Sequence, residues 1–403
     1  MVQVRLSRNA FFRLLAPSLA AACLLSVGCK PADNGGAAGG GGAAAGDEIL
    51  IGHFASMSGD TSTFGVETDN GVRLAMKEIN EAGGILGKKV RVDTQDDQSK
   101  PEEAKTVVTG FAADPNVVAV IGEVASTRSL NAAPVLQRAG IPMVSPSSTN
   151  PAVTKVGDYI FRVCFIDPFQ GSVMAKFARE DLKVSRAAIL RDQQSDYSVG
   201  LADVFKREFE KLGGTVIKDV SYNAKDHDFR SQLAQVKDAE AIFIPGYYGE
   251  VGTIARQARE LGIKAPLMGG DGWDSEKLIE GAGGAGKALE GCYFSNHYSK
   301  DDKSNERSQK FVEAYTKEYG KAPSGLAALG YDAMMIVADA IKRGGAAERD
   351  KIKEALAQTK DYPAVTGDIT IDANRNATKP AVVLEIQGAE FVYKKTIQPE
   401  AGA

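Results

Sequence analysis

Residues 117–149, VVAVIGEVASTRSLNAAPVLQRAGIPMVSPSST, decide the fold class of this chain. The segment opens with the apolar run 117–121 and closes with a second apolar run at 141–144. Between them, residues 129–139 have the pattern of a helix. Two strands joined by such a helix lie parallel in one sheet. The segment therefore predicts an α/β fold.

The same alternation extends in both directions along the chain. Before this segment, apolar runs at 49–51 and 90–92 alternate with helical stretches at 71–82 and 101–113. After residue 167 a second series follows, with helices at 169–182, 201–212, 229–237 and 251–261 and strands at 187–190, 216–220, 241–244 and 266–268. Strands that alternate with helices of about 10–15 residues predict parallel sheets covered on both faces. We therefore expect two α/β units in tandem.

The C-terminal part has a different order of elements. Helical patterns at 311–319, 326–341 and 352–357 come first, and strand-like runs at 369–371, 382–386 and 391–393 follow. This order excludes a third complete α/β unit.

Composition supports two folded lobes and argues against a nucleic-acid partner. Hydrophobic residues make up 43% of the 403 residues, which is enough apolar material for a core. At roughly 100–200 residues per domain, the length predicts two lobes. Charges are nearly balanced, with 48 Lys and Arg against 52 Asp and Glu, and no basic run with interleaved aromatics occurs.

The first 28 residues have the pattern of a signal peptide. Arg5, Arg8 and Arg13 precede an apolar stretch at 14–25, which ends in small residues. A membrane anchor is the alternative, but this stretch is shorter than the roughly 20 residues that span a bilayer. We expect an exported protein, in the periplasm or at the cell surface.

The region around Cys29 resembles a bacterial lipoprotein signal, which implies that Cys29 carries lipid and that residues 29–46 form a flexible tether. The Gly/Ala-rich tract at 35–46 has few side chains that could pack against a fold. Such signals have Leu or Val three positions before the cysteine, where this chain has Ser26.

Small hydroxyl residues and glycine gather directly after the predicted strands. In open α/β sheets, ligands bind beyond the carboxyl ends of the strands, so these segments are the candidates for a binding site. They are 56–60 (SMSGD), 122–127 (GEVAST), 145–149 (SPSST), 193–197 (QQSDY), 246–250 (GYYGE) and 269–273 (GGDGW).

These segments, in this order, resemble the leucine/isoleucine/valine-binding protein family over about residues 49–393. The best-matching pieces are 71–75 (GVRLA), 78–80 (EIN), 82–87 (AGGILG), 96–97 (DD), 139–142 (AGIP), 145–146 (SP) with Thr149, 170–171 (QG), 246–248 (GYY), 270–273 (GDGW) and 331–333 (YDA). The resemblance implies two Rossmann-like lobes joined by three hinge crossovers, the type I periplasmic-binding fold. Lobe 1 would be 47–166 plus 296–376, and lobe 2 would be 167–295 plus 377–403.

The resemblance also implies a function without catalysis. A protein of this family is the substrate-binding component of an ABC importer, which captures an amino acid between two closing lobes and delivers it to permease subunits. We expect a monomer with a branched-chain or other aliphatic amino acid as ligand, and without a cofactor or metal. Urea, short amides, aromatic acids and polar amino acids remain alternative ligands, and a ligand-sensing receptor remains an alternative role.

An amino acid is a zwitterion, so a closed pocket must supply partners for both of its charges. Asp271, between two glycines, is the candidate for the ammonium group, although an Asp can also fix a turn. The hydroxyls of Ser126 and Thr149, with the backbone N–H groups of Ala125 and Ser147, are the candidates for the carboxylate. Helix capping is the alternative role of these hydroxyls.

Phe64, Tyr197 and Tyr247 occupy positions that in the family enclose the side chain of the ligand. Phe64 replaces a more usual tyrosine, which makes this wall more apolar and favours an aliphatic ligand. Ordinary core packing is the alternative for each ring. Tyr248, Trp273 and Tyr331 are weaker candidates.

Cys164 and Cys292 could form one disulfide or remain two buried thiols. The family topology places both on crossing strands, which implies a hinge disulfide. An enzyme is disfavoured, because the chain contains no HExxH, CxxC or GxSxG motif and only three histidines, His53, His227 and His297.

Overall fold

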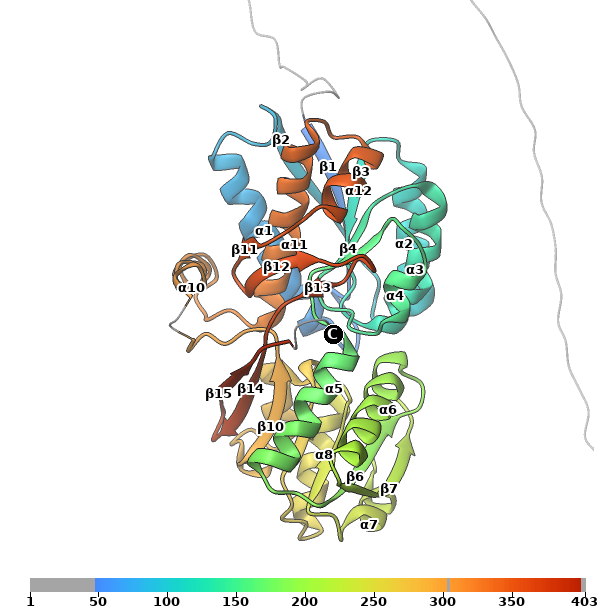
Figure 1. The fold of residues 1–403 in the computed structure, drawn as a ribbon, viewed down its shortest axis with the longest axis vertical. Helices are drawn as coiled ribbons and strands as arrows, with labels where there is room; N and C mark the ends of the chain where they lie inside the picture. Colours follow the sequence, from blue (N-terminus) through green and yellow to red (C-terminus); the bar gives the residue numbers. More distant parts are fainter. Residues whose placement is uncertain (1–47, 303–304, 400–403) are drawn as a thin grey trace, which may run out of the picture. The chain divides into compact units, whose positions relative to one another are not determined.

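Lobe 1 is built on a parallel sheet of five strands (Figure 1). The computed structural model describes residues 48–302 and 305–399; the predicted signal peptide 1–28, the tether 29–46 and Cys29 lie outside the described residues. In their order across the sheet, the strands are β2 (Lys89–Asp96), β1 (Glu48–Ala55), β3 (Val117–Ile121), β4 (Met143–Ser145) and β5 (Ile160–Arg162).

Seven helices and a small antiparallel sheet complete this lobe among the described residues. The helices are α1 (Ser62–Glu81), α2 (Pro101–Ala113), α3 (Ser126–Ala139), α4 (Ala152–Lys155), α10 (Glu306–Tyr319), α11 (Gly325–Gly344) and α12 (Arg349–Ala357). The small sheet consists of β11 (Tyr362–Ala364), β12 (Gly367–Ile371) and β13 (Ala377–Thr378). Ile369 and Ile371 of β12 are buried in the same core cluster as Ile49 and Ile51 of β1, so the small sheet belongs to lobe 1.

Lobe 2 is built on a mixed sheet of seven strands. Across the sheet these are β15 (Glu390–Ile397), β14 (Ala381–Gln387), β10 (Cys292–Asn296), β9 (Leu267–Gly269), β8 (Ala241–Phe243), β6 (Arg186–Asp192) and β7 (Thr215–Tyr222). The helices are α5 (Asp167–Lys176), which continues into a π-helical turn (Phe177–Asp181), and α6 (Asp196–Lys211), α7 (Arg230–Val236), α8 (Tyr248–Glu260) and α9 (Glu276–Gly281). Short 3-10 turns lie at Asp271–Trp273 and Lys287–Leu289.

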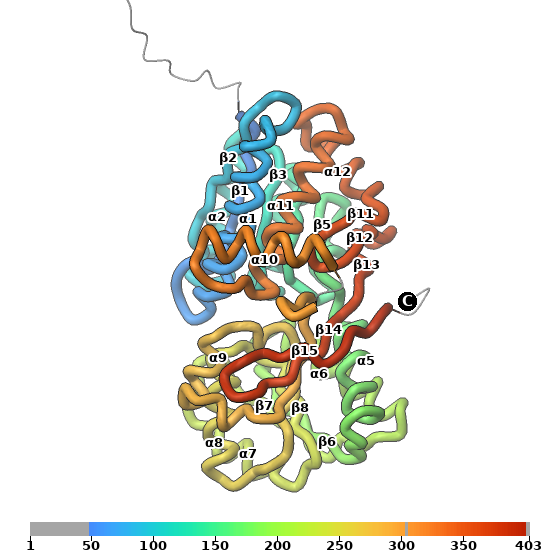
Figure 2. Tube along the Cα trace, turned by 90° about the vertical axis from the view of Figure 1, so that its left-hand side faces the viewer, coloured from blue at the N-terminus to red at the C-terminus, as the bar shows by residue number. Residues whose placement is uncertain are grey.

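The chain passes between the two sheets three times. The first crossover joins β5 to α5, the second joins β10 to α10, and the third joins β13 to β14. Figure 2 shows the C-terminal strands β14 and β15 beside lobe 2, whereas β11 to β13 lie with lobe 1. The predicted fold class, two Rossmann-like lobes with three crossovers, is confirmed.

Several helices begin before the residues that the apolar pattern indicated. Helix α6 begins at Asp196 rather than at residue 201, because Ser195 caps it by accepting a hydrogen bond from the N–H of Ser198. Helix α1 begins at Ser62 rather than at residue 71. First turns are rich in polar residues, so apolar periodicity locates the middle of a helix better than its start.

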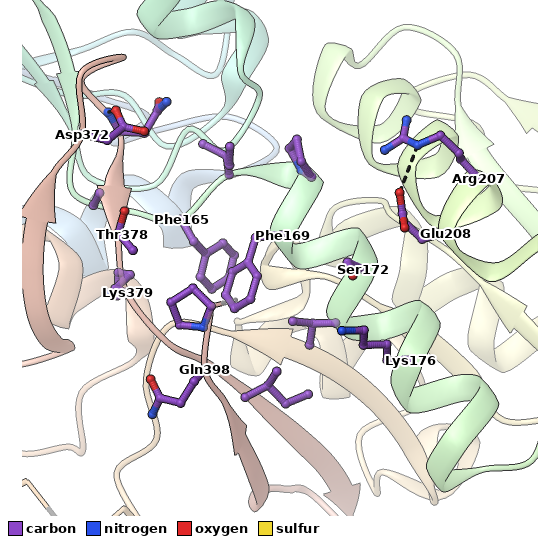
Figure 3. Close-up of a pocket in the computed structure, with 17 residues that line it drawn as sticks. Phe165, Phe169, Ser172, Lys176, Arg207, Glu208, Asp372, Thr378, Lys379 and Gln398 are labelled. Atoms are coloured by element: carbon purple, nitrogen blue, oxygen red, sulfur yellow. Dashed lines mark hydrogen bonds and ion pairs between the residues drawn. The ribbon is translucent and has the colours of Figure 1, made fainter. Parts of the chain in front are cut away.

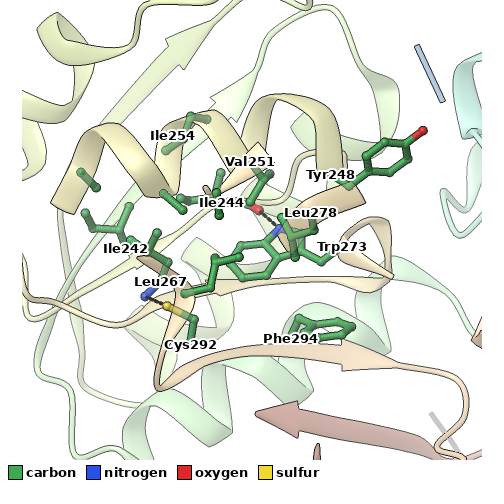
Figure 4. Packing of buried hydrophobic residues seen from close by; sticks show 14 of the residues in the cluster. Ile242, Ile244, Tyr248, Val251, Ile254, Leu267, Trp273, Leu278, Cys292 and Phe294 are labelled. Atoms are coloured by element: carbon green, nitrogen blue, oxygen red, sulfur yellow. Dashed lines mark hydrogen bonds between the residues drawn. The ribbon is translucent and has the colours of Figure 1, made fainter. Parts of the chain in front are cut away.

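The core of lobe 2 gathers around Trp273, which is fully buried (Figure 4). Its indole N–H donates to the carbonyl oxygen of Ile244 at 3.0 Å, so the polar atom of this large ring is satisfied inside the core. Trp273 therefore packs within the core of lobe 2. Along the described chain, no helix combines the length and hydropathy that crossing a bilayer requires.

The predicted disulfide is wrong, because Cys164 and Cys292 are both free and buried in different core clusters. The Cys164 thiol donates to the carbonyl of Ser148 at 3.4 Å, whereas the Cys292 sulfur accepts from the N–H of Leu267 at 3.4 Å. Cys292 opens β10, and this strand reaches the crossover only after Asn296. Four residues of strand span about 13 Å, which removes Cys292 from the hinge.

Candidate functional site

The two lobes meet beyond the carboxyl ends of their parallel strands, where polar contacts join them. The N–H of Asp196 in lobe 2 donates to Thr127 Oγ1 in lobe 1 at 3.1 Å, and Asn150 Nδ2 donates to the carbonyl of Asp196 at 2.8 Å. The hydroxyls of Thr63 and Ser275, one from each lobe, are 3.0 Å apart. The structure therefore shows the lobes closed on each other.

The eight residues predicted for the ligand site are buried, except for Tyr247, which is half-buried. Those of lobe 1 are Phe64, Ala125, Ser126, Ser147 and Thr149, and those of lobe 2 are Tyr197, Tyr247 and Asp271.

Asp271 follows β9 in a turn whose flanking residues must be glycine. A Cβ atom on Gly270 would lie 2.5 Å from the Tyr197 hydroxyl, and one on Gly272 would lie 2.8 Å from the Gly246 carbonyl oxygen. The N–H of Asp271 donates to Gln170 Oε1 at 2.9 Å, which ties this turn to α5. The glycines allow a close approach of neighbouring segments at this edge of the sheet.

The two carboxylate oxygens of Asp271 have different surroundings. Oδ2 lies 3.1 Å from His297 Nε2, whereas the buried Oδ1 has no hydrogen-bond partner among the described residues. A buried carboxylate oxygen without a donor is costly. This atom is where a positively charged ligand group would be stabilised.

At the start of α3, the N–H of Ala125 has a different hydrogen-bond partner from the one that we predicted. This N–H, which we expected to bind the ligand carboxylate, instead donates to Glu123 Oε2 at 2.6 Å. The Glu123 carboxylate is held there by Arg128, whose Nε lies 2.9 Å from the same oxygen. The Glu123 carboxylate thus accepts the hydrogen bond that the Ala125 N–H was expected to donate to the ligand. The hydroxyl of Ser126, also predicted for the ligand, accepts a hydrogen bond from the N–H of Asn150 at 3.2 Å.

The loop after β4 presents donors that the protein leaves open. Ser147 Oγ is buried and has no hydrogen-bond partner among the described residues. The carbonyl of Ser148 accepts a hydrogen bond from the guanidinium of Arg162, and in a trans peptide the N–H of Thr149 points the opposite way. Arg162 also donates to the carbonyl of Asn150 at 2.8 Å. These bonds orient the loop and place a buried positive charge beneath it.

Asp167 connects the lobe 1 loop with Asp271. It lies at the end of the first crossover, and its carboxyl group is beside the Thr149 hydroxyl. Burial and the charge of Asp271 together raise the pKa of Asp167 to about 7, although Thr149 and Arg162 lower it. The charge of Asp271 in lobe 2 and the hydroxyl of Thr149 in lobe 1 thus both affect the Asp167 carboxyl group.

Aromatic rings from both lobes form one wall of the site. Phe64 of lobe 1 contacts Tyr247 and Tyr248 of lobe 2 edge to face, with ring centroids 5.6 and 5.0 Å apart. Tyr197 stacks on Tyr247 with centroids 5.3 Å apart, and its hydroxyl accepts from the N–H of Gly272 at 3.2 Å. The structure thus brings the three predicted wall residues together. Burial raises the pKa of both Tyr197 and Tyr247, so these hydroxyls stay neutral.

A buried cluster of two acids, a serine and an arginine lies behind the start of α3. The Ser56 hydroxyl is 2.7 Å from Asp97 Oδ1 and 2.9 Å from Glu123 Oε1. A hydroxyl has one hydrogen, so one of the two carboxyl groups must carry the other proton. Glu123 is paired with Arg128, which leaves the proton on Asp97. Burial and the charge of Glu123 accordingly raise the pKa of Asp97 to about 8.

This cluster predicts that the protein loses stability as the pH rises. Asp97 keeps its proton in the folded protein up to about pH 8, whereas an unfolded Asp ionises near about pH 4. Between these values the folded state binds more protons, so the free energy of unfolding falls with rising pH by up to about 1.4 kcal/mol per unit. We expect Asp97→Asn, which stays neutral, to reduce the fall in melting temperature between pH 5 and pH 8. Equal falls in the variant and in the wild type would contradict this assignment.

Sequence reasoning missed Glu123, Arg162 and His297. The first two are buried ions, and a buried ion needs a partner, but the sequence does not show which partner is near. Glu123 lies within the candidate segment 122–127, just before a predicted helix. An acidic residue at that place interacts favourably with the helix start, and this was the one indication in the sequence of its role. His297 was considered only as a possible catalytic residue.

Among residues 48–302 and 305–399, no cluster of His, Cys, Asp and Glu is arranged to hold a metal ion.

A separate cavity of about 240 Å³ lies beside the first crossover (Figure 3). Phe165 and Phe169 line it on one side, and Lys379 and Gln398 line it on the other. It has none of the eight predicted ligand residues in its lining, so it lies outside the candidate site.

Comparisons with known proteins agree with this geometry. The family model described as periplasmic binding protein matches residues 48–390. The Leu/Ile/Val-binding protein homolog 1 of Brucella suis is 30% identical over 340 residues, which cover 84% of this chain and 90% of that protein. The leucine-, isoleucine-, valine-, threonine- and alanine-binding protein of Pseudomonas aeruginosa is 31% identical over 330 residues, 81% of this chain and 86% of that protein.

Solved structures with the same fold include two branched-chain amino acid binders. The leucine binding protein LivK of Thermotoga maritima has a TM-score of 0.83 at 40% identity and covers 88% of this chain and 99% of its own. LivJ of Streptococcus pneumoniae, in complex with isoleucine, has a TM-score of 0.83 at 35% identity and covers 87% of this chain and 99% of its own. With its fold, its closed two-lobed site and these relatives, the chain belongs to the periplasmic binding protein family.

Proposed function

We propose that this protein is the substrate-binding component of an ABC importer and that it captures a branched-chain or other aliphatic amino acid between its lobes. The observation that carries the proposal is that each lobe contributes a buried polar atom with no hydrogen-bond partner among the described residues. Asp271 Oδ1 belongs to lobe 2, and Ser147 Oγ belongs to lobe 1. A buried acceptor in one lobe and a buried donor in the other are what a zwitterion can satisfy, with its ammonium group at one end and its carboxylate at the other.

The aromatic wall supports an aliphatic side chain on this ligand. Phe64 is fully buried and offers no hydroxyl, and Tyr247 stacks on Tyr197 behind it. A polar ligand side chain would find few partners on these rings and would lose its hydration without replacement. The relatives named for leucine, isoleucine and valine support the same ligand class.

A ligand that contacts both lobes stabilises the closed form, because only differential affinity shifts such an equilibrium. The closed form is then what the permease subunits would recognise. We further infer that residues 1–28 direct export and that Cys29 carries a lipid anchor, with 29–46 as the tether. Incorporation of labelled fatty acid that is lost in Cys29→Ala tests this anchor.

Thermal-shift screening of the twenty amino acids tests the proposed ligand. A ligand at 100 times its Kd stabilises the protein by about 2.7 kcal/mol, which gives a clear rise in melting temperature. We expect leucine, isoleucine or valine to produce this rise and the charged amino acids to produce none. If only amides or aromatic acids raise the melting temperature, the aliphatic assignment is wrong.

A further inference from the structure

His297 lies directly after β10, at the start of the second crossover, and contacts Asp271. Its Nε2 is 3.1 Å from Asp271 Oδ2, and the residue is 2% exposed. The two residues are 26 positions apart in the sequence. This contact links the crossover to the one carboxylate in lobe 2 that we assign to the ligand ammonium.

The orientation of the His297 ring is well determined. Phe165, from the first crossover, stacks on it with ring centroids 3.6 Å apart and an interplanar angle of 25°. Burial lowers the pKa of His297 to about 4, although Asp271 raises it, so the ring is neutral at pH 7. A carboxylate oxygen can only accept, so Nε2 carries the ring proton and donates to Oδ2. Nδ1 is then an acceptor, and it has no partner among the described residues.

Asp271 needs such a contact to keep its direction. It stands between Gly270 and Gly272, and glycine leaves the backbone freer than any other residue does. The hydrogen bond from its N–H to Gln170 fixes the main chain but not the side chain. With Oδ2 held by His297, the unpartnered Oδ1 is the oxygen that remains available to a ligand.

We propose that His297 is a positioning residue for ammonium recognition: by donating to Asp271 Oδ2 from the second crossover, it directs Oδ1 toward the α-ammonium group of the ligand. This inference rests on the proposed function, because it requires an amino acid as ligand. Since His297 and Phe165 belong to two different crossovers, the orientation of Asp271 depends on the geometry of the hinge. Recognition of the ammonium group is thereby tied to the segments that must bend when the lobes close.

Two polar substitutions of similar size test this role in the full-length protein. His297→Gln places an amide N–H₂ close to the position of Nε2, whereas the shorter side chain of His297→Asn reaches only the position of Nδ1. A hydrogen bond to a charged group accounts for about a 10- to 150-fold change in affinity. Isothermal titration calorimetry with leucine should therefore show His297→Asn weakened by about this factor and His297→Gln close to the wild type.

A double-mutant cycle separates positioning from a purely structural effect. In an Asp271→Asn background, His297→Asn should change leucine affinity by less than about 3-fold, because the carboxylate to be directed is already absent. An equal loss in both backgrounds, or equal affinities of the Gln and Asn variants, would overturn the role of His297 alone. A wild-type protein that binds none of the twenty amino acids would overturn the proposed function together with this inference.

Discussion

Replacing Asp271 by Asn is expected to weaken leucine binding by about 30-fold or more. Asn has the shape of Asp but carries no charge, so the ligand ammonium group would be buried beside a neutral amide. Removing one partner of a buried charge pair costs about 2–5 kcal/mol, and each 1.4 kcal/mol corresponds to about a factor of ten in Kd. The substitution removes the charge from the carboxylate whose Oδ1 has no hydrogen-bond partner among the described residues.

The unliganded Asp271→Asn protein should be as stable as the wild type or slightly more stable. Asp271 raises the pKa of the neighbouring Asp167, which means that the two carboxyl groups repel each other in the empty site. Titration calorimetry measures the affinity, and thermal melts without ligand measure the stability. Asp238→Asn, an exposed position of the same lobe, is the matched control. An affinity within about 5-fold of the wild type would contradict the assignment of the ammonium site.

Arg162→Met should have the largest effect on stability. Arg162 is fully buried at the end of β5 and donates to the carbonyls of Ser148 and Asn150. Its Nη2 also reaches Thr154 Oγ1 at 3.3 Å. Met fills a similar volume without any donor, so these buried acceptors lose their partners and Asp167 loses the positive charge that lowers its pKa. We expect a loss of about 3–5 kcal/mol in the free energy of unfolding.

The loss corresponds to a fall of roughly 4–7 °C in melting temperature, because the entropy of unfolding is about 2.1 cal/mol/K per residue. Arg138→Met, on the exposed side of α3, is the matched control and should change the melting temperature little. Leucine affinity should fall as well, because the loop that carries Ser147 and Thr149 is no longer held. A melting temperature equal to that of the control would show that Arg162 does not organise this loop.

Much of the candidate site followed from the positions of residues along the chain. Ser126, Ser147 and Thr149 come directly after strands β3 and β4, and Asp271 comes directly after β9. The carboxyl ends of parallel strands share one edge of a sheet, so residues that follow them gather without any knowledge of side-chain packing. The prediction for Ala125 was wrong because backbone position shows where an N–H lies but not which acceptor reaches it first.

The sequence by itself determined the class of this protein: alternating apolar runs and helical stretches predict two α/β lobes, since each element must bury its apolar face against its neighbours in the chain. Only the tertiary structure decided which charges meet. The fold makes three such contacts. Glu123 accepts a hydrogen bond from the first N–H before α3, Arg162 donates to the loop after β4, and His297 contacts Asp271. Their energies depend on burial and on distances of a few ångströms, which residue order does not encode. The same holds for Cys164 and Cys292, which the fold leaves free and buried in different core clusters.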